Sequence, residues 1–598
     1  MGSIKHCFLV FLALPLAAAV SYRYQGAVDW VVTWKTNGTI DIEARDGIAV
    51  RASAGVRGFA AKQFNYTPEV ESEAYTVSLT TVSTMTDASP VLYVMGRDAS
   101  GKTVMYQNVG KPAKEERSYK ILFTLNRAIK AFEIGLSLPN VSGGEIIVKD
   151  IVLEQFIPPA DALAQIAPKG RTRWAATAID RTYGSDAFDP RSRDTALKLL
   201  ACAGVLDTRA GITWNNVEAE RGKIDLTDYN DRVALFDHYG ISLSIVCLGG
   251  TPSWASGKVP ERDIPENMRK SLGAYKVARS YWAPKDWNDW ERFVESAVRA
   301  GKGRVKAWEI INEPDLPSEG FMGTYEEYRE YVRHAYIAAK RADPDCRIFL
   351  GAFVSGEWMP RLFNDGWAKY FDGMCTHPYA NTGAGVLMRN NNAQYTSIAL
   401  GAPKETWITE VGFQFGWKTG PGLVTSEEEK AREGRIALEG LAKRSKFIAW
   451  YTAQEKGNMF GLSRIEANGS LRPMPIYYEM GDISGRLKKS GGPIAVRVEG
   501  TGIFAKGSPC SVRLTVKNTS SAALAVKLWP VGFIDALGIA NDGPNAADAD
   551  VTLPAGTEKV IEMKCTPSEK ASGKYAVGIA VICDGGNSLA LSDIEIAK

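Results

Sequence analysis

Residues 308–314 read Trp-Glu-Ile-Ile-Asn-Glu-Pro, and residues 407–413 read Trp-Ile-Thr-Glu-Val-Gly-Phe. In each stretch an apolar run ends in a carboxylate, which is Glu313 in the first and Glu410 in the second. The strands of a parallel barrel are apolar inside, whereas their C-terminal ends open on the face where such barrels carry their active sites. Carboxylates at these two positions are therefore expected to take part in a reaction rather than to stabilise the fold.

Short apolar runs alternate with helical patterns through the middle of the chain, as in parallel βα units. This alternation predicts an α/β fold, a (β/α)8 TIM barrel over residues 165–488, with Glu313 ending the fourth strand and Glu410 ending the seventh. The expected strands lie near residues 173–179, 205–210, 242–248, 305–311, 346–353, 371–376, 404–409 and 446–451.

The segments on either side of the expected barrel alternate apolar and polar residues over short runs. Residues 20–158 are predicted to form an N-terminal β-sandwich of the carbohydrate-binding-module type, and residues 494–598 a C-terminal immunoglobulin-like β-sandwich. Aromatic side chains of the first sandwich either bind sugar or form its core. The candidates are Tyr22, Tyr24, Trp30 and Trp34.

Residues 1–19 have the pattern of a signal peptide. Lys5 precedes an apolar stretch over residues 7–16 and a small-residue cleavage site at residues 17–19. A membrane anchor is the alternative, but the apolar stretch is short for a bilayer, and no later segment is long and apolar enough to span one. We therefore expect a secreted or periplasmic protein with no membrane span in the mature chain.

Composition and charge exclude several classes of function. The 71 basic and 68 acidic residues nearly balance, so nothing indicates a nucleic-acid partner. The mature chain keeps only His238, His334 and His377, which speaks against a multi-histidine metal site. Motifs for nucleotides, dinucleotides or a serine nucleophile are missing. No metal or cofactor is expected, and the sequence leaves the oligomeric state open.

The cysteines of the mature chain fall into two groups. Four lie in expected barrel elements and are predicted to be buried thiols: Cys202, Cys247, Cys346 and Cys375. Three lie in the last domain, where one disulfide can form and one thiol remains: Cys510, Cys565 and Cys583.

Two carboxylates facing each other across a barrel are suited to the cleavage of a glycoside. One delivers a proton to the departing oxygen, and the other acts on the opposite side of the anomeric carbon. Glu313 and Glu410 are separated by 97 residues, which corresponds to three strands around the barrel. Carboxyl groups roughly 5 Å apart would retain the anomeric configuration, and groups about 6.5 to 9.5 Å apart would invert it.

On these motifs the chain resembles clan A glycoside hydrolases and looks most like glycoside hydrolase family 39. Residues 308–314 and 407–410 match the motifs of strands four and seven. Arg209 at the end of strand two, the Gly-Thr-Pro-Ser-Trp-Ala-Ser loop at residues 250–256 and Thr-His-Pro-Tyr at residues 376–379 extend the match. The resemblance covers the barrel only.

The resemblance implies roles for individual residues. Glu313 would be the acid/base and Glu410 the nucleophile, with Arg209 stabilising the ionised form of Glu410. Asn312 would hydrogen-bond the 2-hydroxyl of the sugar. The candidates for a hydrogen bond to Glu410 or to the sugar are His377 and Tyr379.

Aromatic residues near strand ends are expected to form a platform for the sugar. Trp450 is the best of these because it matches the strand-eight aromatic of the family, and Trp254 is also a candidate. Trp358 and Trp417 are further candidates, and these two and Trp254 could equally belong to the core. By contrast, Glu309 and Glu405 are expected to make structural hydrogen bonds or salt bridges.

The sequence thus predicts a secreted retaining β-glycoside hydrolase that cleaves a polysaccharide or its oligosaccharides by double displacement. A non-catalytic carbohydrate-binding protein is one alternative. The other is a transglycosylase, which would use the same carboxylates and pass the sugar to an acceptor other than water. The identity and linkage of the sugar, and exo or endo action, are left open.

Overall fold

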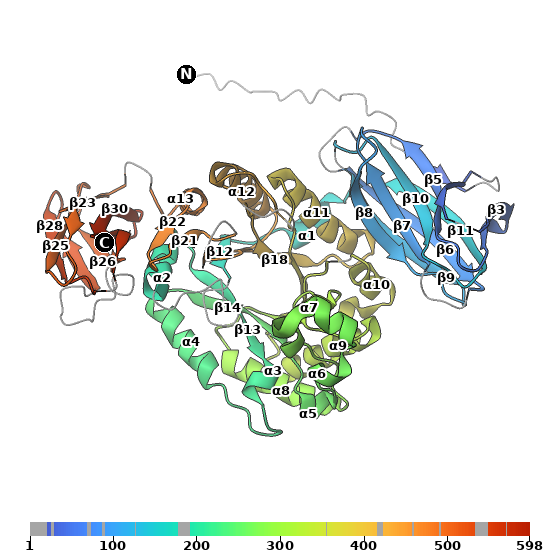
Figure 1. The fold of residues 1–598 in the computed structure, drawn as a ribbon, viewed down its shortest axis with the longest axis horizontal. Helices are drawn as coiled ribbons and strands as arrows, with labels where there is room; N and C mark the ends of the chain where they lie inside the picture. The colour runs from blue at the N-terminus through green and yellow to red at the C-terminus, as the bar shows by residue number, and fades with distance from the viewer. Residues whose placement is uncertain are drawn as a thin grey trace, which may run out of the picture. The chain divides into compact units, whose positions relative to one another are not determined.

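A computed structural model of the chain describes residues 21–24, 29–36, 38–68, 73–85, 90–125, 127–177, 192–354, 356–415, 422–456, 460–488, 492–500, 502–532, 548–569 and 571–597. The expected signal peptide lies outside these residues. The chain divides into two compact units, coloured along the sequence in Figure 1. The first comprises Met1–Pro159 with Ala399–Gly401, and the second comprises Ala160–Ile398 with Ala402–Lys598. The predicted domain limits at residues 158, 165, 488 and 494 stay predictions.

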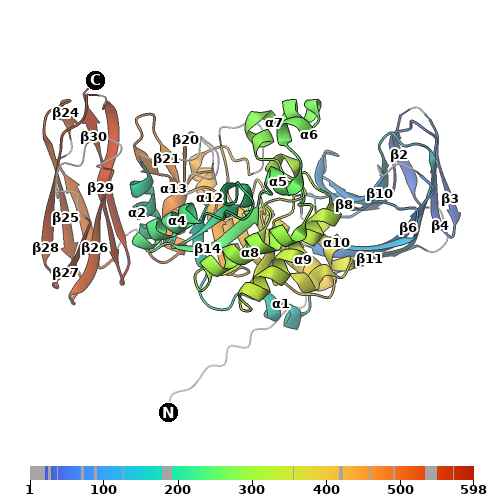
Figure 2. The same cartoon turned by 90° about the horizontal axis from the view of Figure 1, so that it is seen from below.

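The first unit is a sandwich of two antiparallel sheets, which Figure 2 shows as two layers. One sheet has the order β3-β4-β11-β6-β9 with β1 paired to β11, and the other has the order β2-β5-β10-β7-β8. The strands are β1 (Tyr22–Arg23), β2 (Val31–Lys35), β3 (Ile40–Arg45), β4 (Gly47–Ala52), β5 (Gly58–Asn65), β6 (Glu73–Ser83), β7 (Val91–Arg97), β8 (Thr103–Gly110), β9 (Arg117–Leu125), β10 (Ala131–Leu138) and β11 (Gly144–Gln155).

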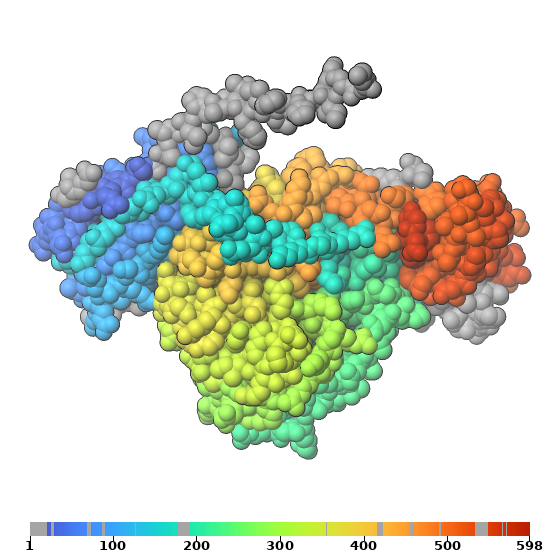
Figure 3. All heavy atoms as spheres, turned by 180° about the vertical axis from the view of Figure 1, so that it is seen from behind, coloured from blue at the N-terminus to red at the C-terminus, as the bar shows by residue number. Residues whose placement is uncertain are grey.

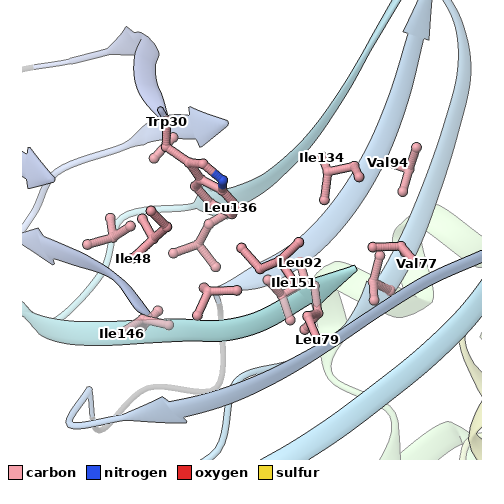
Figure 4. Close-up of a cluster of buried hydrophobic side chains, with 14 of the residues drawn as sticks. Trp30, Ile48, Val77, Leu79, Leu92, Val94, Ile134, Leu136, Ile146 and Ile151 are labelled. Carbon is pink, nitrogen blue, oxygen red and sulfur yellow. The ribbon is translucent and has the colours of Figure 1, made fainter. Parts of the chain in front are cut away.

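The core of this sandwich forms where alternate residues of the two sheets meet. Figure 4 shows Leu79 of β6 beside Leu92 of β7, Val77 of β6 near Val94 of β7, and Leu136 of β10 next to Trp30 in the same cluster. Trp30 is thus a core residue, so of the two roles that the sequence left open for it the core role is confirmed. Tyr22 and Tyr24 are partly buried against the core, whereas Trp34 is exposed.

The second unit begins with a closed barrel of eight parallel strands, which confirms the predicted fold. The first strand pairs with both the second and the last, so the sheet has no free edge. Its interior holds small and large apolar side chains in contact, among them Ala175, Phe349 and Trp407. The strands are β12 (Arg173–Ala176), β13 (Asp207–Thr213), β14 (Ser242–Gly249), β15 (Ala307–Ile310), β16 (Ile348–Leu350), β17 (Gly373–Thr376), β18 (Glu405–Val411) and β19 (Phe447–Trp450).

Helices follow the barrel strands, and Figure 3 shows part of the surface that they form. The longest is α9, whose first turn is closed by a capping box between Thr324 and Glu327. The helices are α1 (Ala160–Ile166), α2 (Arg193–Cys202), α3 (Trp214–Val217), α4 (Thr227–His238), α5 (Ser253–Ser256), α6 (Pro260–Asp263), α7 (Glu266–Ala278), α8 (Trp287–Gly301), α9 (Tyr325–Ala342), α10 (Trp358–Asn364), α11 (Gly383–Ala399), α12 (Glu427–Ala442) and α13 (Pro475–Ile483). In the part of the chain that the structure describes, no helix is long and apolar enough to cross a membrane.

Two further groups of strands complete the second unit. A small sheet of β20 (Gln454–Lys456), β21 (Ser463–Ile465) and β22 (Leu471–Pro473) follows the barrel. The last strands form two sheets, β23-β25-β28 and β24-β30-β29-β26-β27, in which β24 runs parallel to β30. These two sheets form the C-terminal β-sandwich that was predicted, and its immunoglobulin-like type stays a prediction. The strands are β23 (Ile494–Glu499), β24 (Ile503–Phe504), β25 (Cys510–Asn518), β26 (Leu524–Val531), β27 (Ala549–Leu553), β28 (Glu558–Cys565), β29 (Gly573–Cys583) and β30 (Ser588–Ile596).

The cysteines agree with the burial expected of them. Those of the barrel region, Cys202, Cys247, Cys346 and Cys375, are buried free thiols. In the last sandwich, the strand register places Cys510 opposite Cys565. The disulfide among the last three cysteines stays a prediction.

Candidate active site

Glu313 and Glu410 reach the same site from different strands. Glu410 lies on β18, and Glu313 lies three residues beyond the end of β15. Ile311 and Glu313 have positive φ angles of 62° and 42°, a backbone region that a β-branched residue such as Ile rarely adopts. Strain of this kind costs on the order of 1–3 kcal/mol per residue and gathers at functional sites.

Gly351, which follows β16, lies close against this turn. A Cβ atom on Gly351 would lie 1.7 Å from the carbonyl oxygen of Ile311, so only glycine fits. The glycine therefore lets the chain turn directly after β15 and present Asn312 and Glu313 at the end of the barrel.

The two carboxylates are close to each other. An oxygen of Glu313, an oxygen of Glu410 and a ring nitrogen of His377 all lie within 4.8 Å of one another. Both carboxyl groups are nearly buried, with side-chain exposures of 13% and 12%.

Arg209 on β13 links three side chains of the site. Its Nη1 donates to Glu410 Oε1 at 2.7 Å, and its Nη2 donates to Asn312 Oδ1 at 2.7 Å. Its Nε and Nη2 also donate to the two carboxylate oxygens of Glu309 at 2.6 and 3.0 Å. Glu309 is fully buried, so its role is the structural salt bridge that the sequence predicted.

The contacts of Arg209 determine how Asn312 is oriented. A guanidinium can only donate hydrogen bonds, so the amide oxygen of Asn312 must face it. The amide nitrogen of Asn312 is consequently on the other side and can donate to a ligand.

His377 and Tyr379 follow β17 and contact different carboxylates. The hydroxyl of Tyr379 donates to Glu410 Oε2 at 2.8 Å. Nδ1 of His377 lies 2.6 Å from Glu313 Oε1, and its Nε2 lies 3.1 Å from Thr409 Oγ1. The sequence offered both residues as donors to Glu410 or to the sugar; Tyr379 contacts Glu410, whereas His377 makes its hydrogen bond with Glu313 and lies 3.7 Å from Glu410.

The charges of the site act on the titration of His377 and Tyr379. Burial alone would lower the pKa of His377, but the charge of Glu410 and the hydrogen bond with Glu313 outweigh it and raise this pKa. Burial, reinforced by the charge of Glu410, raises the pKa of Tyr379 well above its ordinary value, so its hydroxyl keeps its proton as a donor.

Among the described residues, Glu313, His377 and Glu410 form a cluster of potential metal ligands. The closeness of His377 to Glu313 is accounted for by a hydrogen bond, so the cluster does not require an ion. The absence of a metal or cofactor stays a prediction.

The structure corrects the expected role of Trp450. Its indole is 0% exposed, and its Nε1 donates to the carbonyl oxygen of Phe460 at 2.7 Å. The ring also reaches toward Gly434 of α12, so it points outward into the helical layer and cannot form a platform for sugar.

The other expected platform residues have different surroundings. Trp254 on α5 is partly exposed, donates to the carbonyl oxygen of Glu218 at 2.9 Å and contacts Trp214 edge to face. Trp358 packs against the rings of Tyr325 and Tyr328. Trp417 lies outside the described residues.

Sequence reasoning missed three residues of the site. Thr409 contacts His377 from the strand that carries Glu410. Tyr451 and Phe460 lie with their ring centroids 6.4 and 5.6 Å from that of Tyr379. Tyr451 directly follows Trp450, the last residue of β19.

Comparison with known proteins gives the following relatives. No protein-family model matches the chain. A Caldicellulosiruptor saccharolyticus protein named "Beta-xylosidase" is 33% identical over 86 residues, 13% of this chain and 18% of that protein. A Pinus contorta protein named "Coniferin beta-glucosidase" is 26% identical over 171 residues, 28% of this chain and 29% of that protein. The chain thus matches less than a third of the length of either relative.

Solved structures similar to this chain include glycoside hydrolases of family 39. One from Bacteroides cellulosilyticus WH2 is 14% identical, with 81% of this chain and 96% of that chain covered and a TM-score of 0.37. Another from Xanthomonas axonopodis pv. citri is 14% identical, with 67% and 93% covered and a TM-score of 0.39. Because these identities and TM-scores are low, the function of the chain is inferred from its own residues.

Proposed function

We propose that this chain is a retaining β-glycoside hydrolase with Glu313 as acid/base and Glu410 as nucleophile. One observation carries the proposal: oxygens of the two carboxylates lie within 4.8 Å of each other at the C-terminal ends of the fourth and seventh strands. Retaining enzymes place their carboxyl groups about 5 to 5.5 Å apart, whereas inverting enzymes leave about 6.5 to 9.5 Å for a water molecule. The short separation supports retention.

In the first step, an oxygen of Glu410 attacks the anomeric carbon while Glu313 gives its proton to the departing glycosidic oxygen. The bond from the anomeric carbon to that oxygen breaks, and a covalent glycosyl ester of Glu410 forms. In the second step, Glu313 takes a proton from water, whose oxygen attacks the same carbon and releases Glu410. The configuration is inverted twice and so retained.

The neighbouring groups fit these steps. Arg209 and Tyr379 each donate to one oxygen of Glu410, which holds the carboxylate in place and stabilises its charge. His377, itself held by Thr409, fixes the orientation of Glu313. The amide nitrogen of Asn312 is oriented to donate to the 2-hydroxyl of a sugar, a hydrogen bond that strengthens in the transition state.

The proposed substrate is a polysaccharide or its oligosaccharides. Support for β-linked sugars comes from the names of the two curated relatives, a β-xylosidase and a β-glucosidase. The predicted signal peptide supports a site of action outside the cell or in the periplasm.

The test is the release of reducing ends by the mature protein from neutral and acidic polysaccharides and from aryl β-glycosides. Activity that Glu410→Gln and Glu313→Gln both abolish is expected. Glu405→Gln is the matched control, because Glu405 lies on the same strand but hydrogen-bonds Trp407 and Arg347 instead. Equal activity of Glu410→Gln and the wild type would overturn the assignment of the nucleophile.

Two further readouts separate the alternatives. Proton NMR of the first product should show the same anomeric configuration as the substrate. The opposite configuration would show inversion. Products longer than the substrate would indicate a transglycosylase, and sugar binding with no turnover across the panel would indicate a non-catalytic carbohydrate-binding protein.

A further inference from the structure

A row of aromatic rings crosses the outer face of the β2-β5-β10-β7-β8 sheet in the first unit. Leu92 and Val94 of β7 point into the core, so Tyr93 between them points outward. Tyr106 lies on the neighbouring edge strand β8, where its register partner is Met95. On the other side, Trp34 of edge strand β2 is paired with Phe59 of β5.

The rings of this row follow one another in contact. The centroid distances are 5.9 Å from Trp34 to Phe59, 5.6 Å from Phe59 to Tyr93, and 5.5 Å from Tyr93 to Tyr106, the last pair being stacked. The row runs from one edge of the sheet to the other, which is roughly 19 Å for five strands. That length suits a chain of sugars rather than a single ring.

The two ends of the row are open to solvent. Trp34 is 52% exposed and Tyr106 is 49% exposed. In the described strands of the first unit, the exposed large hydrophobic residues all lie on β2 and β8, the edge strands of this sheet, and the other two are Val31 and Val104. Apolar exposure gathered on one sheet in this way marks a binding surface.

Polar groups accompany the rings. Glu133 on the central strand β10 is 2% exposed and accepts hydrogen bonds from Tyr93 and Gln63 at 2.7 and 3.1 Å. Arg97 lies 3.9 Å from the same carboxylate, so these two charges of the face balance each other. The middle of the row is closely packed, because Tyr93 is fully buried and its hydroxyl fills the space over Gly135 of β10, so only the two ends of the row can contact a ligand.

We propose that this sheet face binds an uncharged glycan chain laid across the strands, with Trp34 and Tyr106 as the exposed stacking residues. Flat aromatic rings pack against the C–H faces of pyranoses, and the amide of Gln63 and the guanidinium of Arg97 supply hydrogen-bond donors. The balanced charge favours a neutral polymer over a uronic-acid polymer. The site lies within the first unit and does not depend on catalysis by the barrel.

The test uses the full chain with Glu410→Gln, so that substrate is not consumed. Retardation in native gels that contain a soluble xylan, a soluble β-glucan or a polyuronate is measured for this protein and for Trp34→Ala/Tyr106→Ala. We expect retardation by a neutral polymer, weakened at least tenfold by the double substitution, and little effect of the polyuronate. Tyr478→Ala, which removes a partly exposed ring from α13, is the matched control and should bind normally.

A second measurement separates this site from the barrel. In the active chain, Trp34→Ala/Tyr106→Ala should slow the hydrolysis of insoluble polysaccharide and leave the hydrolysis of aryl glycosides unchanged. The proposal fails if the double variant binds as tightly as its parent, or if no neutral polymer retards the parent. It also fails if analytical ultracentrifugation shows that the parent is a dimer and that the substitutions dissociate it into monomers. That result would identify the face as a contact between two copies of the chain.

Discussion

Arg209 is the residue on which the geometry of the candidate active site depends most. Its guanidinium is buried and donates to Glu309 through two nitrogens, which fixes its plane. The remaining donors then point to Glu410 and Asn312. Glu309 therefore acts on the site through Arg209, as a positioning residue three strands away from the nucleophile.

Arg209→Met is expected to damage both stability and activity. It leaves Glu309 and Glu410 without their cation, and breaking a buried ion pair in this way costs about 3–5 kcal/mol. Thermal unfolding and kcat/KM on an aryl glycoside measure the two effects. Arg209→Lys keeps the charge but not the planar fork, so it should recover part of the stability and little of the activity. Wild-type stability of Arg209→Met would contradict the role given to this residue.

His377 should make stability depend on pH with a definite sign. Its folded pKa is raised by Glu410 and Glu313 against the effect of burial, while Arg209 opposes the rise. The stabilisation from its proton is thus fully present below about pH 6.5, the ordinary value for histidine, and is lost as pH rises through the raised pKa. The difference in Tm between wild type and His377→Gln should therefore shrink from pH 5.5 to 8.5. A difference that grows over this range would contradict the contact with the two glutamates.

Among the secondary-structure elements, the junction of β15 and β16 determines where the acid/base lies. β15 ends at Ile310, and the turn that follows holds two residues at positive φ. Gly351 packs against the carbonyl oxygen of Ile311 in this turn. The hydroxyl of Tyr328 on α9 donates to the carbonyl oxygen of Ile310 at 3.2 Å. The helix behind the barrel thus helps to fix the active-site turn.

Gly351→Ala should reduce activity far more than stability. The added methyl group would overlap the carbonyl oxygen of Ile311 and push the Asn312–Glu313 turn away from Glu410. Misplacement by about 1 Å can cost about 100-fold in rate, whereas overpacking costs about 1–3 kcal/mol. Gly502→Ala, at a glycine that has open space around its Cβ position and no positive φ, is the control for a general effect on folding. Unchanged kcat in Gly351→Ala would show that the turn tolerates displacement.

At the scale of the whole molecule, the barrel and the C-terminal sandwich of the second unit are joined by buried polar contacts. Lys198 of α2 is 3% exposed, pairs with Asp548 at 2.7 Å and Asp194 at 3.0 Å, and donates to the carbonyl oxygen of Pro530. Asn587 donates to the carbonyl oxygen of Cys202 at 2.9 Å. The last sandwich is therefore held against the first barrel helix.

Lys198→Met should weaken this junction without touching the active site. It keeps an apolar stem of similar length but removes the charge that joins α2 to the sandwich, which we expect to cost about 1–3 kcal/mol. Calorimetry should show a lower Tm, or a separate early transition as the sandwich unfolds by itself. Lys527→Met, on the sandwich strand β26, is the control. A single unshifted transition would show that the junction does not depend on Lys198.

The extent to which the sequence predicted this protein differs between fold and site. All eight barrel strands lie within or next to their predicted ranges, because apolar runs and helical periods are local signals. The prediction that Trp450 forms a platform for sugar was wrong because barrel strands are buried on both faces, so their sequences do not show which residues point inward. The role of Trp30 was left open for a similar reason. The sequence of an alternating segment does not show whether an aromatic ring faces the core or the solvent.

By itself, the sequence determined the class of fold, the two sandwiches that precede and follow the barrel along the chain, and the position of Glu313 and Glu410 at strand ends. Only the tertiary structure decided which side chains meet: that Arg209 binds Glu309 as well as Glu410, that His377 pairs with Glu313, and that Tyr451 rather than Trp450 lies near the site. The physical reason is that strand formation depends on neighbours along the chain. Contacts between strands depend instead on register and on side-chain direction around the closed barrel, which no local pattern records.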